Sequence, residues 1–157
     1  MKTQMKVAGT WQTATKLQVK VSGVWQTVTK AFVKVSGVWQ QVYAAFTPMS
    51  GTLTAAQYNG GFNVGYQNGS GGTMSPVTFA TGQTVTQFQM AFTVFTVVIS
   101  GFSGDPGQNG FFTTVTYNGQ SRTAATSSYG YSAGVATWTW SSAVTFDIGI
   151  SRAFSIT

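Results

Sequence analysis

The 157-residue chain contains no cysteine, no histidine and no glutamate, and its only acidic side chains are Asp105 and Asp147. Without cysteine the chain forms no disulfide and offers no thiolate as a nucleophile or metal ligand. Without histidine it lacks the most frequent general base and the most frequent metal ligand of proteins. Two carboxylates are few for hydrolytic or transfer chemistry. This inventory predicts a protein that is not an enzyme and that holds no metal or cofactor.

Charge of either sign is scarce, because charged residues make up 6% of the chain where soluble domains usually have about a quarter. Hydrophobic residues reach 43% and aromatic residues 15%, which argues against disorder and supplies material for a packed core. Thr, Ser, Gln, Asn and Gly must therefore cover the surface. Such a composition is typical of extended β proteins and of subunits that bury much of their surface in an assembly.

The net charge of +6 is placed unevenly. All six lysines precede residue 35, and beyond it two Arg balance two Asp. The lysines are Lys2, Lys6, Lys16, Lys20, Lys30 and Lys34. Their spacing of four, ten or fourteen residues forms no basic cluster or basic helix, so we expect no nucleic-acid partner.

Long apolar runs are also missing. The N-terminal "MKTQMKVAGTWQ" has a basic start but no apolar segment after it, which argues against an export signal. The most apolar window, Met90–Phe102, is too short and too rich in Thr to span a bilayer. We therefore expect a protein made in a cytoplasm and not inserted into a membrane.

What the sequence does contain is a repeat. Trp11, Trp25 and Trp39 are fourteen residues apart and define the blocks "KVAGTWQTATKLQV", "KVSGVWQTVTKAFV" and "KVSGVWQQVYAAFT". The second and third blocks agree at ten positions, and the first and second at nine. Self-similarity at a fixed period indicates one supersecondary unit built several times.

The apolar residues of each block alternate with period two, and β-branched and aromatic residues dominate, as in strands. Ser22-Gly23 and Ser36-Gly37, with Ala8-Gly9 in the first block, suit the positive φ angles of a two-residue hairpin turn. Two five-residue strands and two short turns, the second around Thr29-Lys30, account for fourteen residues. Residues 1–47 are thus predicted to form a meander of three β-hairpin repeats.

In this register Lys34 lies opposite Trp39 and Val35 opposite Val38, so the lysine can cover the indole ring in a cation–π contact. Both faces of the ribbon then carry large apolar groups, which an isolated pair of short strands cannot bury. We predict a module for attachment or oligomerisation; the alternative is a sheet pinned by tryptophan inside one domain core. The residues that we assign to the module are Trp11, Trp25, Trp39, Lys20, Lys34 and Phe32.

Residues 48–157 carry many short alternating runs separated by Gly and Asn, without a helical stripe. Thr47–Leu53 ("TPMSGTL") has the composition of a linker, with Pro48 and Gly51 as chain breakers. Asn118-Gly119, in "TVTYNGQSRT", predicts a type I′ hairpin. The fold class is therefore all-β, an N-terminal hairpin meander followed by a β-sandwich of jelly-roll or immunoglobulin-like type.

A few residues of this second region stand out. Trp138 and Trp140 share one face of a strand and are predicted core anchors. Asp105 is predicted to cap a turn beside Pro106, and Asp147 to face solvent, where Arg122 or Arg152 could pair with either acid.

Three Gly-rich segments are candidate contact loops, Tyr66–Thr73, Gly104–Gly110 and Ser127–Gly134. Tyr129 and Tyr131, in the last of these, are candidate receptor-contact residues, since tyrosine is favoured at interfaces. The alternative is that these rings cover their own domain.

Two stretches resemble proteins of a known kind. "KAFVKVSGVWQQV" resembles the short "VKVGGVWK"-type repeats of tailed-bacteriophage virion proteins. "GFFTTVTYNGQSRTAATSSYGY", followed by "VATWTWSSAVTFDIGISRAFSI", is similar to a β-rich domain of phage tail and fibre-like proteins. That domain has a hairpin with an "NG" turn, then "TTWTWS" and an aromatic "NPF"-like segment; this chain lacks the proline, and Phe146 takes the aromatic place.

The resemblance implies a structural protein of the virion, assembled in the host cytoplasm, with no catalytic residues to transfer. Its place would be an exposed tail, baseplate or fibre component that acts by multivalent binding; the alternative is a decoration (cement) protein of the capsid. Other virion proteins are the expected partners, together with further copies of this chain (a trimer is one such form) and a host surface glycan or protein. A glycan-degrading or glycan-binding tip is a third hypothesis.

Overall fold

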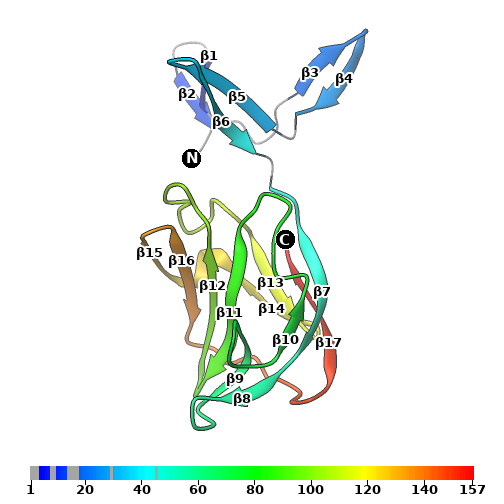
Figure 1. Cartoon of the computed structure of the whole chain (residues 1–157), viewed down its shortest axis with the longest axis vertical. Helices are drawn as coiled ribbons and strands as arrows, with labels where there is room; N and C mark the ends of the chain where they lie inside the picture. The colour runs from blue at the N-terminus through cyan, green and yellow to red at the C-terminus, as the bar shows by residue number, and fades with distance from the viewer. Residues whose placement is uncertain (1–3, 8–9, 14–17, 29, 45) are drawn as a thin grey trace. The chain divides into compact units, whose positions relative to one another are not determined.

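In the computed structural model, residues 4–7, 10–13, 18–28, 30–44 and 46–157 are described. These residues form β-strands and a single 3-10 turn, η1 (Ala124–Thr126), so the predicted all-β class is confirmed. None of them forms a helix long and apolar enough to cross a membrane. The chain divides into two compact units, Met1–Phe46 and Thr47–Thr157, which are described in turn (Figure 1).

The described residues of the first unit form three separate two-stranded antiparallel sheets, one for each tryptophan of the repeat (Figure 1). Their strands are β1 (Gln4–Val7) with β2 (Thr10–Thr13), β3 (Gln18–Val21) with β4 (Val24–Thr27), and β5 (Lys30–Val35) with β6 (Val38–Ala44). The predicted hairpins are therefore present.

Two of the predicted turns have the expected backbone. Ser22 and Gly23 have φ angles of 48° and 84°, and Ser36 and Gly37 have 49° and 86°. Positive φ at both central residues is the type I′ geometry that matches the twist of a hairpin. The turn predicted at Ala8-Gly9 lies outside the described residues.

The continuous meander is not confirmed. Within the described ranges, no strand of one hairpin pairs with a strand of the next. The strands β1 to β4 have four residues each rather than five, and Lys30 begins β5 instead of forming a turn. Strand β6 carries a bulge opposite the step from Ala31 to Phe32, which repetition of a fourteen-residue unit does not reveal.

The second unit is a β-sandwich, as predicted, with every strand pair antiparallel (Figure 1). The five-stranded sheet has the order β10 (Thr73–Ser75), β7 (Met49–Thr54), β17 (Ser151–Ile156), β13 (Thr114–Tyr117), β14 (Gln120–Thr123). The six-stranded sheet has the order β15 (Ser128–Ser132), β16 (Val135–Trp140), β12 (Val94–Ser100), β11 (Thr84–Ala91), β9 (Asn63–Gln67), β8 (Ala56–Tyr58).

Aromatic rings join the two sheets. Phe88 of β11 is fully buried, and its ring centroid lies 6.1 Å from that of Phe154 and 6.4 Å from that of Tyr117, both in the opposite sheet. Trp138 and Trp140 of β16 are buried as predicted, and their indole N–H groups each donate to a backbone carbonyl at 2.8 Å. These buried aromatic side chains hold the two sheets of the sandwich together.

The linker predicted at Thr47–Leu53 is wrong beyond Pro48, because β7 begins at Met49. Met49 and Leu53 are both buried. Gly51 is not a chain breaker here: a Cβ at this position would lie 2.0 Å from the carbonyl oxygen of Ser75 on the neighbouring strand. Close approach of two backbones explains the glycine.

The hairpin predicted at Asn118-Gly119 is confirmed. Tyr117 and Gln120 are paired at its end, and Asn118 and Gly119 have φ angles of 45° and 77°.

Candidate contact surfaces

The hairpin of β3 and β4 is exposed along its whole length, since every residue from 18 to 27 is exposed. Trp25 leaves 64% and Val24 leaves 63% of its surface accessible. Lys20 is paired with Trp25 across the strands, and its Nζ lies 5.9 Å from the centre of the indole ring. The predicted cation–π contact is therefore present in this hairpin.

The register repeats around the other two tryptophans. Lys6 pairs with Trp11 in the first hairpin, and Lys34 pairs with Trp39 in the third. Val35 also pairs with Val38, as predicted. The side chains of Trp11 and Trp39 lie outside the described set.

Further apolar side chains are exposed in this first unit. Phe32 leaves 51% of its surface accessible and Val38 leaves 63%. Val19 and Val21, on β3, are exposed as well. Two-stranded ribbons of this length are at best marginally stable in water. Burying one such side chain in a contact would contribute about 1.5–3 kcal/mol.

A second apolar surface lies at one end of the sandwich. The strand registers place the turns after β8, β11 and β16 at the same end of the sandwich, the end toward which β7 runs. Among the described residues, every exposed large apolar side chain of the sandwich lies at this end. They are Phe62, Phe92, Ile148 and Ile150.

Phe62 and Phe92 meet across two turns, with their ring centroids 5.8 Å apart. Phe92 leaves 76% of its surface accessible and has a φ of 55°, a left-handed conformation that is uncommon for a bulky residue. Its turn thus holds an aromatic ring out in solvent at some conformational cost.

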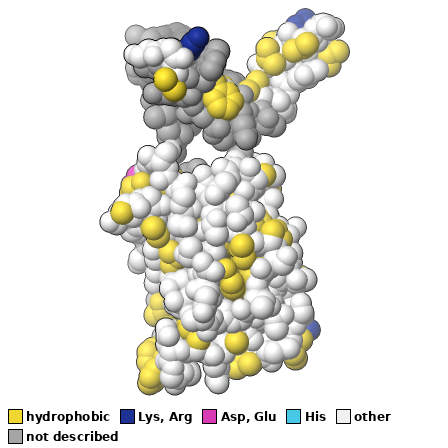
Figure 2. All heavy atoms as spheres, viewed as in Figure 1, with side chains coloured by type: hydrophobic (Ala, Val, Ile, Leu, Met, Phe, Trp, Pro, Cys, Tyr) yellow, Lys and Arg dark blue, Asp and Glu magenta, His cyan; other side chains and the backbone are white. Residues whose placement is uncertain are grey.

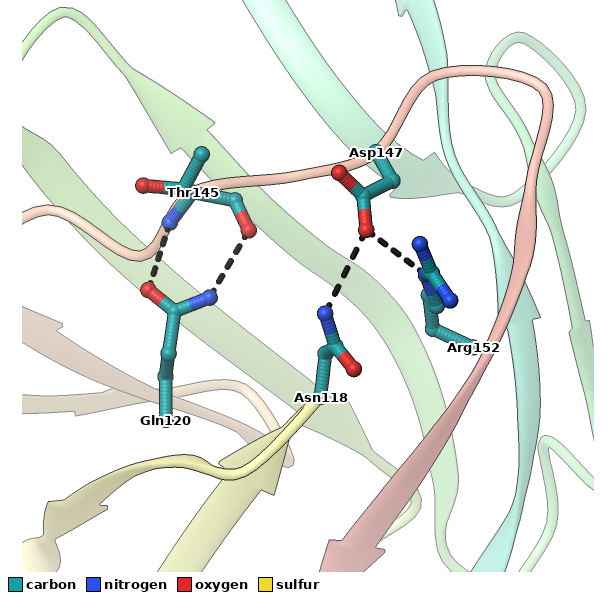
Figure 3. A network of polar contacts seen from close by, with 5 residues as sticks. All are labelled: Asn118, Gln120, Thr145, Asp147 and Arg152. Carbon is teal, nitrogen blue, oxygen red and sulfur yellow. Dashed lines mark hydrogen bonds and ion pairs between the residues drawn. The ribbon is translucent and has the colours of Figure 1, made fainter.

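Polar contacts fasten the loop of residues 141–150 at the same end (Figure 3). Asp147 Oδ2 accepts from Arg152 Nε at 2.6 Å and from Asn118 Nδ2 at 3.3 Å. Gln120 exchanges two hydrogen bonds of 2.9 Å with the backbone of Thr145. Of the two arginines named as possible partners of an acid, Arg152 pairs with Asp147, so Asp147 is tied to its own domain.

The other arginine has a different role. Arg122 donates to the backbone carbonyls of Ser142 and Ala143. It holds the same loop from the side of β14 and pairs with neither acid in the contacts of the described residues.

The candidate receptor tyrosines are not on a loop, because Ser128–Ser132 is the edge strand β15 and the turn is confined to residues 133–134. The ring of Tyr129 lies 5.3 Å from that of the buried Trp138, and its hydroxyl donates to Asp105 Oδ1. Tyr131 is half-buried and pairs with Ala136. For Tyr129, this placement favours the alternative that the ring covers its own domain.

Asp105 caps its turn as predicted, accepting from the backbone N–H of Gly107 at 2.8 Å. The hydrogen bonds from Tyr129 and then from Gly107 hold the pKa of the Asp105 carboxyl below its usual value. Burial, and then the bond to Asp105, raises the pKa of the Tyr129 hydroxyl. The pair therefore fastens the loop of residues 104–110 to β15.

A shallow groove of about 530 Å³ lies on the outer face of the six-stranded sheet. It is lined by Gln67, Asn68, Thr86, Gln87, Thr96, Val98 and Thr137. Two of these residues belong to the predicted contact loop Tyr66–Thr73; the others were not predicted. The sequence signal that could have found them is the absence of charge from all six strands.

No protein-family model, no curated protein and no solved structure matches the chain. The described residues contain no group of three or more His, Cys, Asp or Glu side chains that could hold a metal ion. Figure 2 shows how few charged side chains the visible face of the sandwich carries, with Asp or Glu and Lys or Arg colours only at its margins.

Proposed function

We propose that this chain is an exposed structural component of a tailed-bacteriophage virion, in the tail, baseplate or fibre. The hairpins of residues 1–46 attach it to other virion proteins or to further copies of itself, and the sandwich makes the outward contacts. The observation that carries this proposal is the exposure of the β3–β4 hairpin, which leaves Trp25 and Val24 uncovered, whereas Trp138 and Trp140 of the sandwich are buried.

The repeat supports an attachment role because the same strand register occurs three times. Each tryptophan lies opposite a lysine in the same register. A chain that offers several equivalent contacts gains avidity when its partner is symmetric, without any single strong contact. The resemblance of "KAFVKVSGVWQQV" to repeats of phage virion proteins supports the same conclusion.

The geometry also bears on the alternative, decoration of the capsid. Strands β3 and β4 each pair on one side only, so each hairpin offers free edges in the part of the chain that the structure describes. A free edge can add to a sheet of a coat protein by β-augmentation. The proposal assigns no catalytic step in either case.

Localisation on intact particles tests the proposal. Cryo-electron microscopy of particles that carry a tagged copy is expected to place the tag on the tail, baseplate or fibre. Density confined to the head would contradict the tail assignment and favour decoration. Absence of the chain from purified particles would overturn the proposed function altogether.

A further inference from the structure

We propose that the groove on the outer face of the six-stranded sheet binds an uncharged oligosaccharide. This inference names the ligand class of the sandwich, and it rests on the proposed function only for the assignment of the sandwich as the contact domain. Four observations support it: the missing charge, the register, the bulge and the free polar groups.

The six-stranded sheet has no charged residue in any of its strands. The charged side chains of the sandwich lie on the other sheet or in loops: Arg122 on β14, Arg152 on β17, Asp105 and Asp147 in loops. A groove without charge has no ionic attraction for phosphates, sulfates or carboxylates. Its ligand must be recognised by neutral hydrogen bonds.

The register aligns the groove residues across four strands. Gln67 pairs with Gln87, Gln87 with Val98, and Val98 with Thr137. Directly paired residues share one face of a sheet, so these four side chains form a row. Strands lie about 4.8 Å apart, so the row extends over roughly 14 Å, enough for a short chain of sugar units.

The core fixes the direction in which this row points. The residues that follow or precede it along β11, β12 and β16 are Phe88, Val97 and Trp138, and all three are fully buried. Since successive side chains of a strand alternate between faces, the row lies on the outer face. A packed core behind it keeps the spacing of the row rigid.

A β-bulge shapes one end of the groove. Thr86 is the extra residue between Val85 and Gln87, which pair with Ile99 and Val98. Its carbonyl accepts from the backbone N–H of Asn68 at 3.0 Å, and its hydroxyl donates to the carbonyl of Val98 at 3.3 Å. The bulge therefore brings Asn68 beside the row; bulges are frequent next to functional sites.

The polar side chains of the groove have unused hydrogen-bonding capacity. Within the described part of the chain, the side chains of Gln67, Asn68, Gln87, Thr96 and Thr137 take part in no hydrogen bond. Some other glutamines of the sandwich are occupied, since Gln89 accepts from Tyr58 and Gln108 donates to the carbonyl of Ala124 at 3.1 Å, whereas the exposed Gln57 has no side-chain hydrogen bond. The groove thus brings three unbonded amides close together, those of Gln67, Asn68 and Gln87.

The chemistry of these groups matches a neutral sugar. Each amide offers two donors and an acceptor oxygen, and each threonine hydroxyl offers both functions. Neighbouring hydroxyls of a sugar ring also combine donor and acceptor. The apolar side chain of Val98, in the middle of the row, can pack against the apolar C–H face of a sugar ring. An acidic glycan would find no cation among the lining residues.

The test uses the purified full-length chain on an array of neutral, sialylated and sulfated oligosaccharides, followed by calorimetric titration of the best neutral binder. We expect binding to neutral glycans and a loss of about tenfold in affinity for Gln87→Ala and for Thr137→Val, because each removes groups that bond the ligand. Gln57→Ala is the matched control, since Gln57 is an exposed glutamine on β8 outside the groove, and we expect affinity within about twofold.

Three results would overturn the assignment. They are no binding to any neutral glycan, a preference for charged glycans, and binding to neutral glycans that Gln87→Ala and Thr137→Val leave unchanged. Melting temperatures of the variants check folding, and Thr137→Val keeps the shape and β-propensity of the strand. Failure here leaves the particle-localisation test untouched, and the two proposals can therefore fail separately.

Discussion

The two units of the chain use tryptophan in opposite ways. Trp138 is fully buried in the sandwich, 4.7 Å from the ring of Phe112, and its N–H is bonded to the carbonyl of Gln108. Trp25 of the repeat leaves 64% of its surface accessible, and the contact described for its ring is with Lys20. The same residue type thus completes a core in one unit and leaves a surface uncovered in the other. The sandwich has a buried aromatic core, whereas the β3–β4 hairpin leaves its apolar side chains exposed.

The largest expected effect contrasts these two tryptophans. We expect Trp138→Ala to lower the free energy of unfolding of the sandwich by about 3–5 kcal/mol, since it empties a buried site and leaves a carbonyl unbonded. Trp25→Ala should change it by less than about 0.5 kcal/mol, as for other exposed positions. Urea unfolding measured at a protein concentration low enough to prevent association checks both. Equal losses would show that the repeat is part of the same core.

A close approach of backbones gives the next effect. Gly51→Ala should cost about 3 kcal/mol, because its Cβ would collide with the carbonyl of Ser75 and force β7 and β10 apart. Gly130→Ala, where a Cβ meets nothing within 4 Å, is the control and should stay within about 0.5 kcal/mol. If the Gly51→Ala and Gly130→Ala variants had the same melting temperature, the proximity of β7 and β10 would not explain why residue 51 is a glycine.

The repeat can be examined through association. Trp25→Ala should weaken self-association by about ten- to a hundredfold, since it removes about 1.5–3 kcal/mol of buried apolar surface at each copy. Gln26→Ala, on the neighbouring exposed position of β4, should have little effect. Concentration-dependent light scattering distinguishes the two variants. A stronger effect of the glutamine would contradict the role given to the apolar side chains.

The smallest effect appears only at high pH. Burial raises the pKa of Tyr58 to about 12 from its ordinary 10.0, and the protonated hydroxyl donates to Gln89. Because the pKa is higher in the folded state, this contribution to stability is complete below pH 10 and is lost as the pH rises toward 12. Tyr58→Phe should flatten the fall of the melting temperature in that range. If Tyr58→Phe left the fall of the melting temperature unchanged, the ionisation of other groups would be its cause.

Much of the fold could be predicted from local patterns in the sequence. The alternation of β-branched residues and the Ser-Gly and Asn-Gly pairs depend on neighbours in the sequence, and they predicted the hairpins and the sandwich. Gly51 was misread as a linker glycine because its reason, the carbonyl of Ser75, lies 24 positions away and on another strand. Periodicity also could not show whether adjacent hairpins pair with one another.

Less of the candidate site than of the fold could be predicted from the sequence. Tyr129 has the chemistry of a contact residue, but the contacts with Trp138 and Asp105 that occupy it come from distant positions. The groove combines side chains from four strands, and only the register brings Gln67, Gln87 and Thr137 into one row. Each of these residues taken alone is an ordinary polar position of a strand.

The central claim is that the exposed hairpins drive self-association of this chain. Sedimentation equilibrium of the full chain, beside a chain of residues 47–157, tests it most directly. We predict a multimer for the full chain that dissociates on dilution, and a monomer for residues 47–157 at every concentration. A full chain that stays monomeric at concentrations where the shorter chain is also monomeric would contradict the claim.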